Sequence, residues 1–242
     1  SIDADGHRVG WSESSVYDHK TNTVGAVCRC PIGFIQAVSI SDERQARVRK
    51  MLSKRLGSVV VILEAVHRRH NVSAIMRSCE CFGVHEVHLI TDGFRPSKGA
   101  ARGSERWLDI HRYTETAPAI KAVKERGFQV FVADLVEGSF SPDTVPIDQP
   151  TAILMGAELT GVSDEARRLA DGAVCVPMHG LTESLNVSVA AACILQRVTD
   201  RRRAVSEGGD LEESRQDAFF EQWFEWEVQL RQGMIARTRE DR

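Results

Sequence analysis

Short runs of apolar residues alternate with amphipathic stretches along most of the chain. The run SVVVIL at 58–63 is continuous and rich in β-branched residues, which is typical of a strand buried on both faces. Similar runs predict further strands at 86–90, 128–135, 151–156 and 173–178. Helical patterns occupy the stretches 71–83, 119–127, 163–171 and 186–204. Strands that alternate with helices predict an α/β fold, with a mostly parallel sheet and helices on both faces.

Two further helical patterns flank this core. Residues 41–56 form a basic amphipathic pattern, with Ser41 or Asp42 as its N-cap. Residues 211–240 form a second pattern whose middle is rich in Phe and Trp. Such an aromatic stripe must be buried, so packing on the domain or on a second subunit explains it better than stacking on bases. The predicted segments are an N-terminal extension (1–40), a basic helix (41–56), an α/β domain (57–205) and a C-terminal helical extension (206–242).

The composition is that of an ordinary globular protein, with 42% hydrophobic and 27% charged residues. No stretch is apolar for long enough to predict a membrane span, and the first residues lack the pattern of a signal peptide. The six cysteines are therefore expected to be reduced thiols in the cytoplasm. Cys79 and Cys81 would point about 200° apart on a helix, so they cannot clasp one ion together. No metal site is expected, although Cys28 and Cys30 lie in an irregular region.

The net charge of −3 does not suggest a nucleic-acid-binding protein, but the charges are unevenly distributed. Residues 41–56 contain six basic and two acidic side chains. A local basic patch of this kind can meet phosphates. On charge alone, a solvated helix face explains the pattern better.

Three segments place polar residues where ligands bind in α/β folds, near the carboxyl ends of strands. In HNVSAIMRS, Asn71 can cap a helix that closes at Gly83, and Arg77 is placed to hold an anion. In TAILMGAELTG, a glycine after a buried strand admits a ligand, and Glu158 is a candidate for binding or proton chemistry. In VPMHGLTESLNVS, Asn186 enters an Ala-rich helix. A solvated arginine and a well-capped helix would explain the first and third segments without any ligand.

Common nucleotide and hydrolase motifs do not occur in the sequence. No G-x-G-x-x-G follows a strand, and neither a P-loop nor a G-x-S-x-G elbow occurs. A standard dinucleotide site, a P-loop and a nucleophile elbow are therefore not expected.

Taken in order, the three segments resemble the three motifs of the SpoU, or TrmH-like, branch of the SPOUT RNA methyltransferases. The similar stretches are HNVSAIMRSCECFGVHEVHLI, ILMGAELTGVSDEA and VPMHGLTESLNVSVAAACIL. Within this branch, LEAVHRRHN, GSERW and LADGAVCVPM are similar to the TrmH group of tRNA guanosine-2′-O-methyltransferases. The chain departs from that group at Arg69, at Glu183 and in its longer N-terminal extension. These departures bear on the choice of RNA more than on the chemistry.

The resemblance implies a SPOUT fold with a trefoil knot in its C-terminal part, and a homodimer with its active site at the interface. It implies that S-adenosylmethionine is the cofactor, bound by the knot loops. Carried over by position, the cofactor contacts are Ala133, Gly156, Val176, Met178 and Leu185. The backbone makes many contacts of this kind, so apolar residues can serve.

The resemblance also implies roles for residues at the active site. Arg77 would activate the ribose 2′-hydroxyl together with an RNA phosphate, because a ribose hydroxyl is a poor nucleophile at neutral pH. Asn71 and Asn186 would orient the ribose and the loop. Ser184 would donate or accept a hydrogen bond, and Glu158 would fix Arg77 or Asn71.

The same resemblance assigns the RNA contacts to Arg47, Arg55 and His70. The expected activity is methylation of a ribose 2′-hydroxyl in tRNA, at the D-loop guanosine. Two alternatives stay open at this point. One is the same chemistry on ribosomal RNA, and the other is an RNA-binding protein without catalytic activity.

Overall fold

The computed structural model describes residues 16–18, 23–25, 40–91, 104–182 and 184–232. The chain divides into two compact units, residues 1–37 and 38–242. In the first unit, β1 (Val16–Asp18) pairs antiparallel with β2 (Thr23–Gly25). Cys28, Cys30 and Glu183 lie outside the described residues. The basic helix, the α/β domain and the C-terminal helix all belong to the second unit.

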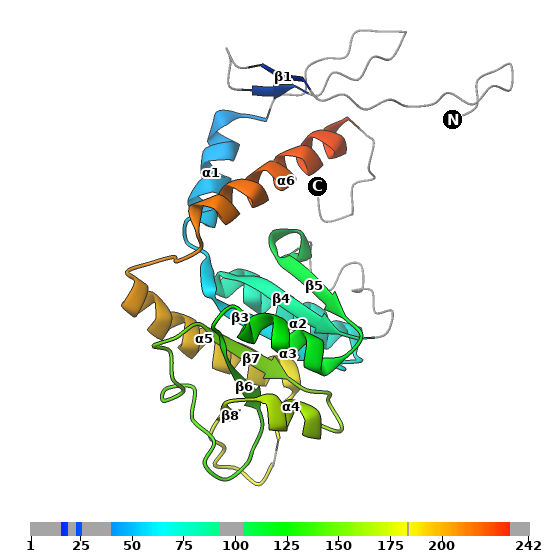
Figure 1. Cartoon of the computed structure of the whole chain (residues 1–242), viewed down its shortest axis with the longest axis vertical. Helices are drawn as coiled ribbons and strands as arrows, with labels where there is room; N and C mark the ends of the chain where they lie inside the picture. Colours follow the sequence, from blue (N-terminus) through cyan, green and yellow to red (C-terminus); the bar gives the residue numbers. More distant parts are fainter. Residues whose placement is uncertain (1–15, 19–22, 26–39, 92–103, 183, 233–242) are drawn as a thin grey trace, which may run out of the picture. The chain divides into compact units, whose positions relative to one another are not determined.

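The second unit is built on a parallel sheet of six strands, which Figure 1 shows. Its order is β5-β4-β3-β7-β6-β8, and every neighbouring pair is parallel. The strands are β3 (Leu56–Glu64), β4 (Val84–Ile90), β5 (Asp109–Tyr113), β6 (Gln129–Ala133), β7 (Thr151–Met155) and β8 (Gly172–Val174). The predicted α/β class is confirmed. The edge strand β5 was not predicted, because its sequence DIHRY is polar and it is only half-buried.

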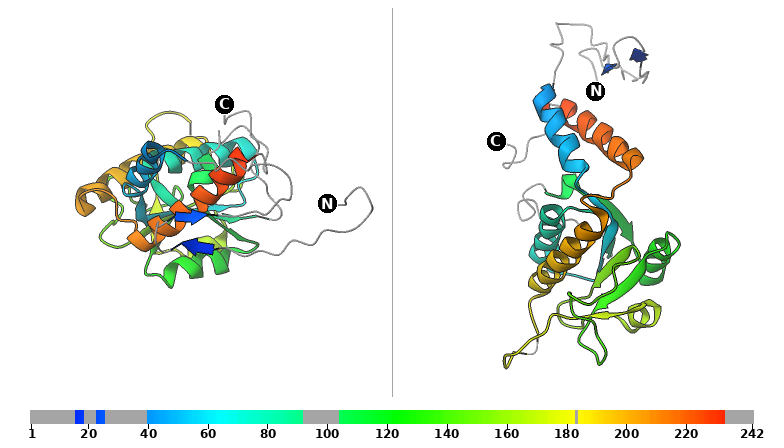
Figure 2. Two further views of the ribbon diagram at one scale, coloured as in Figure 1. Left: turned by 90° about the horizontal axis from the view of Figure 1, so that it is seen from above. Right: turned by 90° about the vertical axis from the view of Figure 1, so that its left-hand side faces the viewer.

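Helices cover both faces of the sheet, as the right-hand view of Figure 2 shows. Alternate residues of β3 point to opposite faces. One set, which includes Val59 and Val61, packs with residues of α2 (Arg69–Phe82) and α5 (Val187–Ser206). The other set, Val60 and Ile62, packs with residues of α3 (Thr116–Lys124) and α4 (Asp164–Leu169). A strand buried on both sides explains the unbroken apolar run that predicts it.

Helix α2 begins two residues before the predicted cap. Arg68 occupies the N-cap position and its side chain makes no capping bond, so the prediction that Asn71 caps this helix is wrong. Asn71 lies in the first turn and is 1% exposed, because its amide is engaged by residues of other segments. The helix ends as predicted at Gly83, whose φ of 76° suits a glycine. Cys79 is buried and Cys81 is exposed, as expected for residues two apart on a helix.

Helices α1 (Asp42–Leu52) and α6 (Glu213–Arg231) pack against each other around a small core of their own. The core residues are Ile40, Val48, Leu52, Phe219, Phe220 and Trp223. Ser41 caps α1, which is one of the two caps predicted, but the helix ends at Leu52 rather than at 56.

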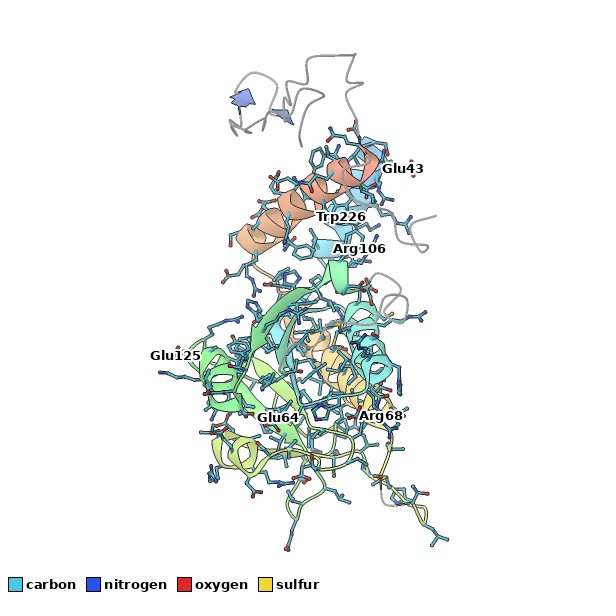
Figure 3. All side chains as sticks on the ribbon, turned by 90° about the vertical axis from the view of Figure 1, so that its right-hand side faces the viewer. Glu43, Glu64, Arg68, Arg106, Glu125 and Trp226 are labelled. Atoms are coloured by element: carbon cyan, nitrogen blue, oxygen red, sulfur yellow. The ribbon has the colours of Figure 1, made fainter. Side chains whose placement is uncertain are left out.

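Cations of the chain also lie over the aromatic rings of α6. Arg49 lies 3.8 Å from the centroid of Phe220, and Arg106 lies 4.6 Å from that of Trp226, which Figure 3 labels. The aromatic stripe of α6 therefore packs within the chain, mainly on α1, which is one of the two kinds of partner that the sequence left open.

A buried carboxylate on β4 ties α6 to the sheet. Glu86 is 0% exposed and accepts a hydrogen bond from Arg215 of α6 at 2.8 Å. Arg215 also reaches Asp109 of β5 at 3.2 Å, while Arg126 reaches Glu86 at 2.9 Å from the turn after α3. Because two guanidinium groups share Glu86, its burial is compensated.

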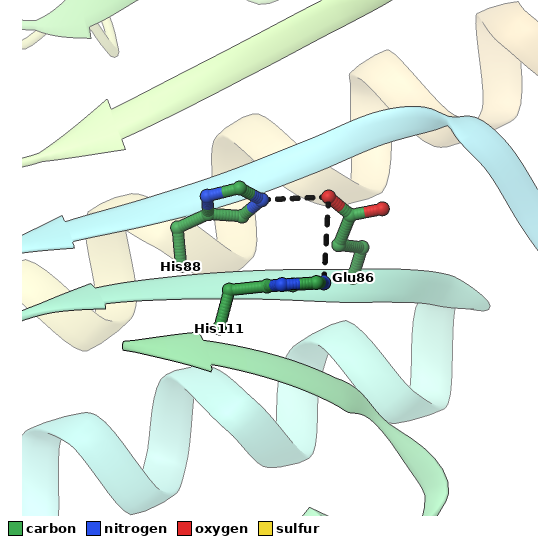
Figure 4. Close-up of side chains that lie close together, drawn as sticks. All are labelled: Glu86, His88 and His111. Atoms are coloured by element: carbon green, nitrogen blue, oxygen red, sulfur yellow. Dashed lines mark hydrogen bonds and ion pairs between the residues drawn. The ribbon is translucent and has the colours of Figure 1, made fainter. Parts of the chain in front are cut away.

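Figure 4 shows how Glu86 lies next to two histidines, His88 and His111. Their ligand atoms lie within 4.8 Å of one another, a spacing that a metal ion could bridge. Burial alone would raise the pKa of Glu86, but hydrogen bonds from His88, Arg126 and Arg215 hold it well below its usual range. Because two arginines already neutralise this carboxylate, the geometry favours an ion-pair cluster over a cation site.

None of the helices in the described segments is both long and apolar enough to span a membrane.

Candidate functional site

A cavity of about 620 Å³ opens beyond the carboxyl ends of β6, β7 and β8. In parallel sheets all strands end at the same edge, so the loops that follow them meet there. The cavity is lined by all five predicted cofactor residues: Ala133, Gly156, Val176, Met178 and Leu185. Glu158, Ser184 and Asn186 also line it. Loops far apart in the sequence therefore build one cavity that is lined by both apolar and polar side chains.

The loop between β7 and α4, residues 156–163, forms one wall of this cavity. Ala157 and Gly161 exchange two backbone hydrogen bonds of 2.9 Å, which fold the loop tightly on itself. A Cβ atom on Gly156 would lie 2.3 Å from the backbone carbon of Gly161. Gly161 itself has a φ of 68°. Only glycine at 156 allows this fold, which brings backbone atoms to the cavity surface.

Three side chains from the three motif segments form a hydrogen-bonded chain beside the cavity. Asn186 donates from Nδ2 to Oδ1 of Asn71 at 3.2 Å, and Asn71 donates from Nδ2 to Oε1 of Glu158 at 2.9 Å. Asn186 also caps α5, because its Oδ1 accepts a bond from the Ser188 amide at 2.9 Å. The two Asn-Val-Ser sequences therefore meet through their asparagines.

Glu158 anchors this chain of bonds. Its carboxylate also accepts bonds from the backbone amides of His67 at 3.3 Å and Arg68 at 3.2 Å. Burial would raise the pKa of Glu158, but the bonds from Asn71 and the two amides lower it, so the carboxylate stays ionised at neutral pH. The prediction allowed Glu158 to fix Arg77 or Asn71, and the structure places it on Asn71.

Arg77 is exposed on α2 and is not among the described residues that line the cavity. It follows Asn71 by six residues, which is about 9 Å along a helix axis. His70 is exposed at the start of the same helix. Ser184 is exposed and does line the cavity. A single chain thus gathers Asn71, Glu158 and Asn186 but leaves Arg77 outside the cavity.

A family model for SpoU rRNA methylases matches residues 58–196, which is more than half of the chain. The chain belongs to the SpoU rRNA methylase family. The matched region contains the whole hydrogen-bonded chain and the cavity.

Known members of the SpoU family are similar to this chain along most of its length. A tRNA (guanosine(18)-2′-O)-methyltransferase of Thermus thermophilus is 42% identical over 157 residues, which cover 64% of this chain and 81% of that protein. The crystal structure of the A. aeolicus TrmH/SpoU tRNA modifying enzyme matches with a TM-score of 0.71 at 30% identity. It covers 77% of this chain and 98% of that one. An AdoMet-bound rRNA methyltransferase from Sinorhizobium meliloti matches with a TM-score of 0.56 at 26% identity, covering 64% and 60% of the two chains.

In this SpoU family member, the structure corrects the RNA contact predicted at Arg55. Its side chain is 1% exposed, because the chain has already left α1 and is entering β3. The guanidinium donates to the carbonyl of Val84 at 3.0 Å and to the carboxylate of Glu80 at 3.3 Å. Arg55 therefore ties the end of α2 to the start of β4; it borders the recess described next but is almost wholly buried.

Arg47 shares a recess with other cations that the family resemblance does not assign to RNA binding. A recess of about 610 Å³ between α1, α2 and α5 is lined by Arg47, Lys50, Lys54 and Arg203. The charge run of residues 41–56 was the signal for Lys50 and Lys54. Arg49 lies in the same run, but it pairs with Asp217 of α6 at 2.8 Å.

Proposed function

We propose that this chain is an S-adenosylmethionine-dependent methyltransferase that acts on the ribose 2′-hydroxyl of guanosine 18 in tRNA. The observation that carries the proposal is the bonded chain of Glu158, Asn71 and Asn186 at the rim of the cavity. Its support is that a 42% identical relative is named for this reaction. Family membership alone leaves the choice of RNA open.

The cavity fits the proposed cofactor in shape and in chemistry. Gly156 supplies the close backbone approach that an adenosine needs, and apolar residues such as Val176 and Leu185 form part of the walls. Asp134, which pairs with Arg167 at 2.7 Å, and Glu158, which accepts a bond from Asn71, also line it, so a ligand with a sulfonium and an ammonium group meets carboxylates there. When bound, S-adenosylmethionine supplies the electrophilic methyl group. We assign Ala133, Gly156, Val176, Met178 and Leu185 to holding it.

The chain's own residues prepare the ribose. Asn71 cannot turn its amide freely, because Glu158 holds its Nδ2 and Asn186 holds its Oδ1. We assign this pair of asparagines to orienting the ribose, and Ser184 to a hydrogen bond at the mouth. We assign the guanidinium of Arg77 to stabilising negative charge on the 2′-oxygen while an RNA phosphate accepts the proton.

A second copy of the chain would complete the site. Arg77 is exposed outside the cavity of its own chain. Leu159, which lines that cavity, is 91% exposed, and Leu181 in the loop before Ser184 is fully exposed, which suits an interface. We propose a homodimer in which each cavity receives Arg77 of the partner subunit.

The trefoil knot predicted for the C-terminal part stays a prediction for this chain. The predicted location of the protein in the cytoplasm stays a prediction as well.

The RNA would lie over Arg47, His70, Lys50 of α1 and Lys54, which follows α1. Lys50 and Lys54 line the same recess as Arg47, and such contacts with phosphates weaken steeply with salt. The aromatic helix α6 would hold α1 in place for this contact.

The test separates tRNA from ribosomal RNA. The protein is incubated with labelled S-adenosylmethionine and each RNA pool, and the methylated nucleoside is mapped. Label on the 2′-oxygen of guanosine 18 in tRNA is the expected result. Label only in ribosomal RNA would support the alternative substrate. An absence of label, with the cofactor still bound, would support a silent RNA-binding protein.

A further inference from the structure

Two segments at the carboxyl edge of the sheet are joined by hydrogen bonds to two carboxylates, one from each segment. Glu158, on the loop after β7, accepts bonds from the backbone amides of His67 and Arg68, on the loop after β3. In return, Glu64 at the end of β3 accepts a bond from the Ser163 amide at 2.8 Å and from the Ser163 hydroxyl at 2.7 Å. The carboxylate of Glu158 therefore binds the loop after β3, and the carboxylate of Glu64 binds the loop after β7.

The environment of Glu64 is built for a carboxylate. Glu64, labelled in Figure 3, is 5% exposed and also accepts a bond from the hydroxyl of Thr116 at the start of α3. These partners provide one backbone amide and two hydroxyl groups, which suit an acceptor-only side chain. An acid buried at this depth is stable only when its oxygens are paired in this way.

The loop that Glu64 holds is the wall of the cofactor cavity. Ala157, Thr160 and Gly161 line that cavity on one side and a second recess of about 880 Å³ on the other. Glu64 and Ser163 line the second recess. Ser163 also caps α4, because its hydroxyl accepts a bond from the Ala166 amide at 3.0 Å.

We infer that Glu64 is a positioning residue for methyl transfer. It fixes the far end of the loop of residues 156–163, while Glu158 fixes the near end and holds Asn71. Without Glu64 the buried side chain of Val162 still attaches the loop to the core, so the loop changes shape while the domain stays folded. This inference rests on the proposed function, since the cavity is taken as the cofactor site.

The test compares three variants with the parent by their affinity for S-adenosylhomocysteine, a measurement that needs no RNA. Glu64→Ala removes all three bonds and is expected to weaken binding about tenfold or more. Glu64→Gln keeps an oxygen for the Ser163 amide and is expected to stay within about threefold of the parent. Thr116→Val is the matched control, because it removes a Glu64 partner that lies outside the loop. Its expected effect is less than about twofold.

A second readout follows the loop itself. Hydrogen exchange at the amides of Ala157 and Gly161 should become faster in Glu64→Ala but not in Thr116→Val. Ser163→Ala, which keeps the backbone amide on Glu64, should lie between these variants and replaces Glu64→Ala if that protein does not fold.

The outcomes of the two proposals differ. If the parent binds S-adenosylhomocysteine and Glu64→Ala binds it equally well with unchanged exchange, the inference is overturned. Equal losses in Glu64→Ala and Thr116→Val would overturn it too, since they would indicate a general structural role. If the parent itself binds no S-adenosylhomocysteine, the proposed function fails instead.

Discussion

Asn186 donates a hydrogen bond to Asn71 although the two residues lie 115 positions apart in the sequence. Each asparagine uses its other amide atom elsewhere: Asn71 Nδ2 on Glu158, and Asn186 Oδ1 on the amide that begins α5. The direction of every bond is therefore fixed by its neighbours. This relationship joins the start of α2, the β7–α4 loop and the start of α5 at one point.

Replacing Asn186 by Asp should separate this bond from helix capping. Asn186→Asp keeps an oxygen for the Ser188 amide but sets a carboxylate oxygen against Oδ1 of Asn71. Because Glu158 prevents Asn71 from turning over, the repulsion stays. We expect kcat/KM for tRNA to fall about a hundredfold, with the melting temperature little changed. Steady-state kinetics that match those of the parent would contradict this role for the pair.

Two inactive variants should restore activity when they share a dimer. If Arg77 serves the partner's cavity, a heterodimer of Arg77→Ala and Asn186→Ala chains contains one intact site. Co-expression with two different tags gives mixed dimers, and about a quarter of the parental activity is expected from random pairing. The control is each variant expressed alone. If the purified heterodimer is as inactive as those controls, Arg77 does not act across the interface.

Arg47 and Arg55 should behave in opposite ways. Arg55→Ala leaves the Val84 carbonyl and the Glu80 carboxylate without their buried partner, so the free energy of unfolding should drop by about 2–4 kcal/mol. Arg47→Ala should leave stability unchanged. It should weaken tRNA binding and reduce the slope of log K against log salt by about one. Chemical denaturation and filter binding at several salt concentrations measure the two effects. A stable Arg55→Ala protein with weaker RNA binding would reverse the assignments.

The stability of the protein should depend on His85 at mildly acidic pH. Burial, with Arg215 and Arg55 nearby, lowers the pKa of His85 to about 4. An unfolded chain has a histidine pKa of about 6.5, so the unfolded state binds more protons between these values. Stability should therefore fall as pH drops from 6.5 towards 4, by roughly 2 kcal/mol at pH 5.

His85→Phe is the matched control for this pH effect. It keeps an aromatic ring against Phe219, whose centroid lies 4.9 Å from that of His85. Glu86 and His111 titrate in both proteins, so the difference between the two stability curves isolates His85. Parallel curves from pH 7 to pH 5 would show that His85 does not contribute.

Local patterns predict those parts of the fold that depend on local causes. The β-branched run of β3 is buried on both faces, and Gly83 ends α2 with a positive φ. Parallel strands end at one edge, so residues after three different strands reach a single cavity. The five predicted cofactor residues meet there for this reason.

Other features depend on contacts that no local pattern contains. Asn71 reads as a helix cap, but its amide serves Glu158 and Asn186 from distant segments. The sequence pattern places Arg55 in a basic helix, but the helix ends at Leu52 and the Arg55 side chain is buried. Glu64 reads as the last residue of a strand, and its role depends on where Ser163 and Thr116 lie in space.

The pairing of α1 with α6 affects when α1 can pack during synthesis of the chain. Arg44 of α1 bonds to Glu227 of α6, which is 183 residues further along the chain. A ribosome releases α1 well before α6, so the basic helix lacks this partner until α6 has been made. A chain that stops before α6 would lack the packing that orders this helix. Chains that lack α6 would then bind RNA less well than chains that contain it.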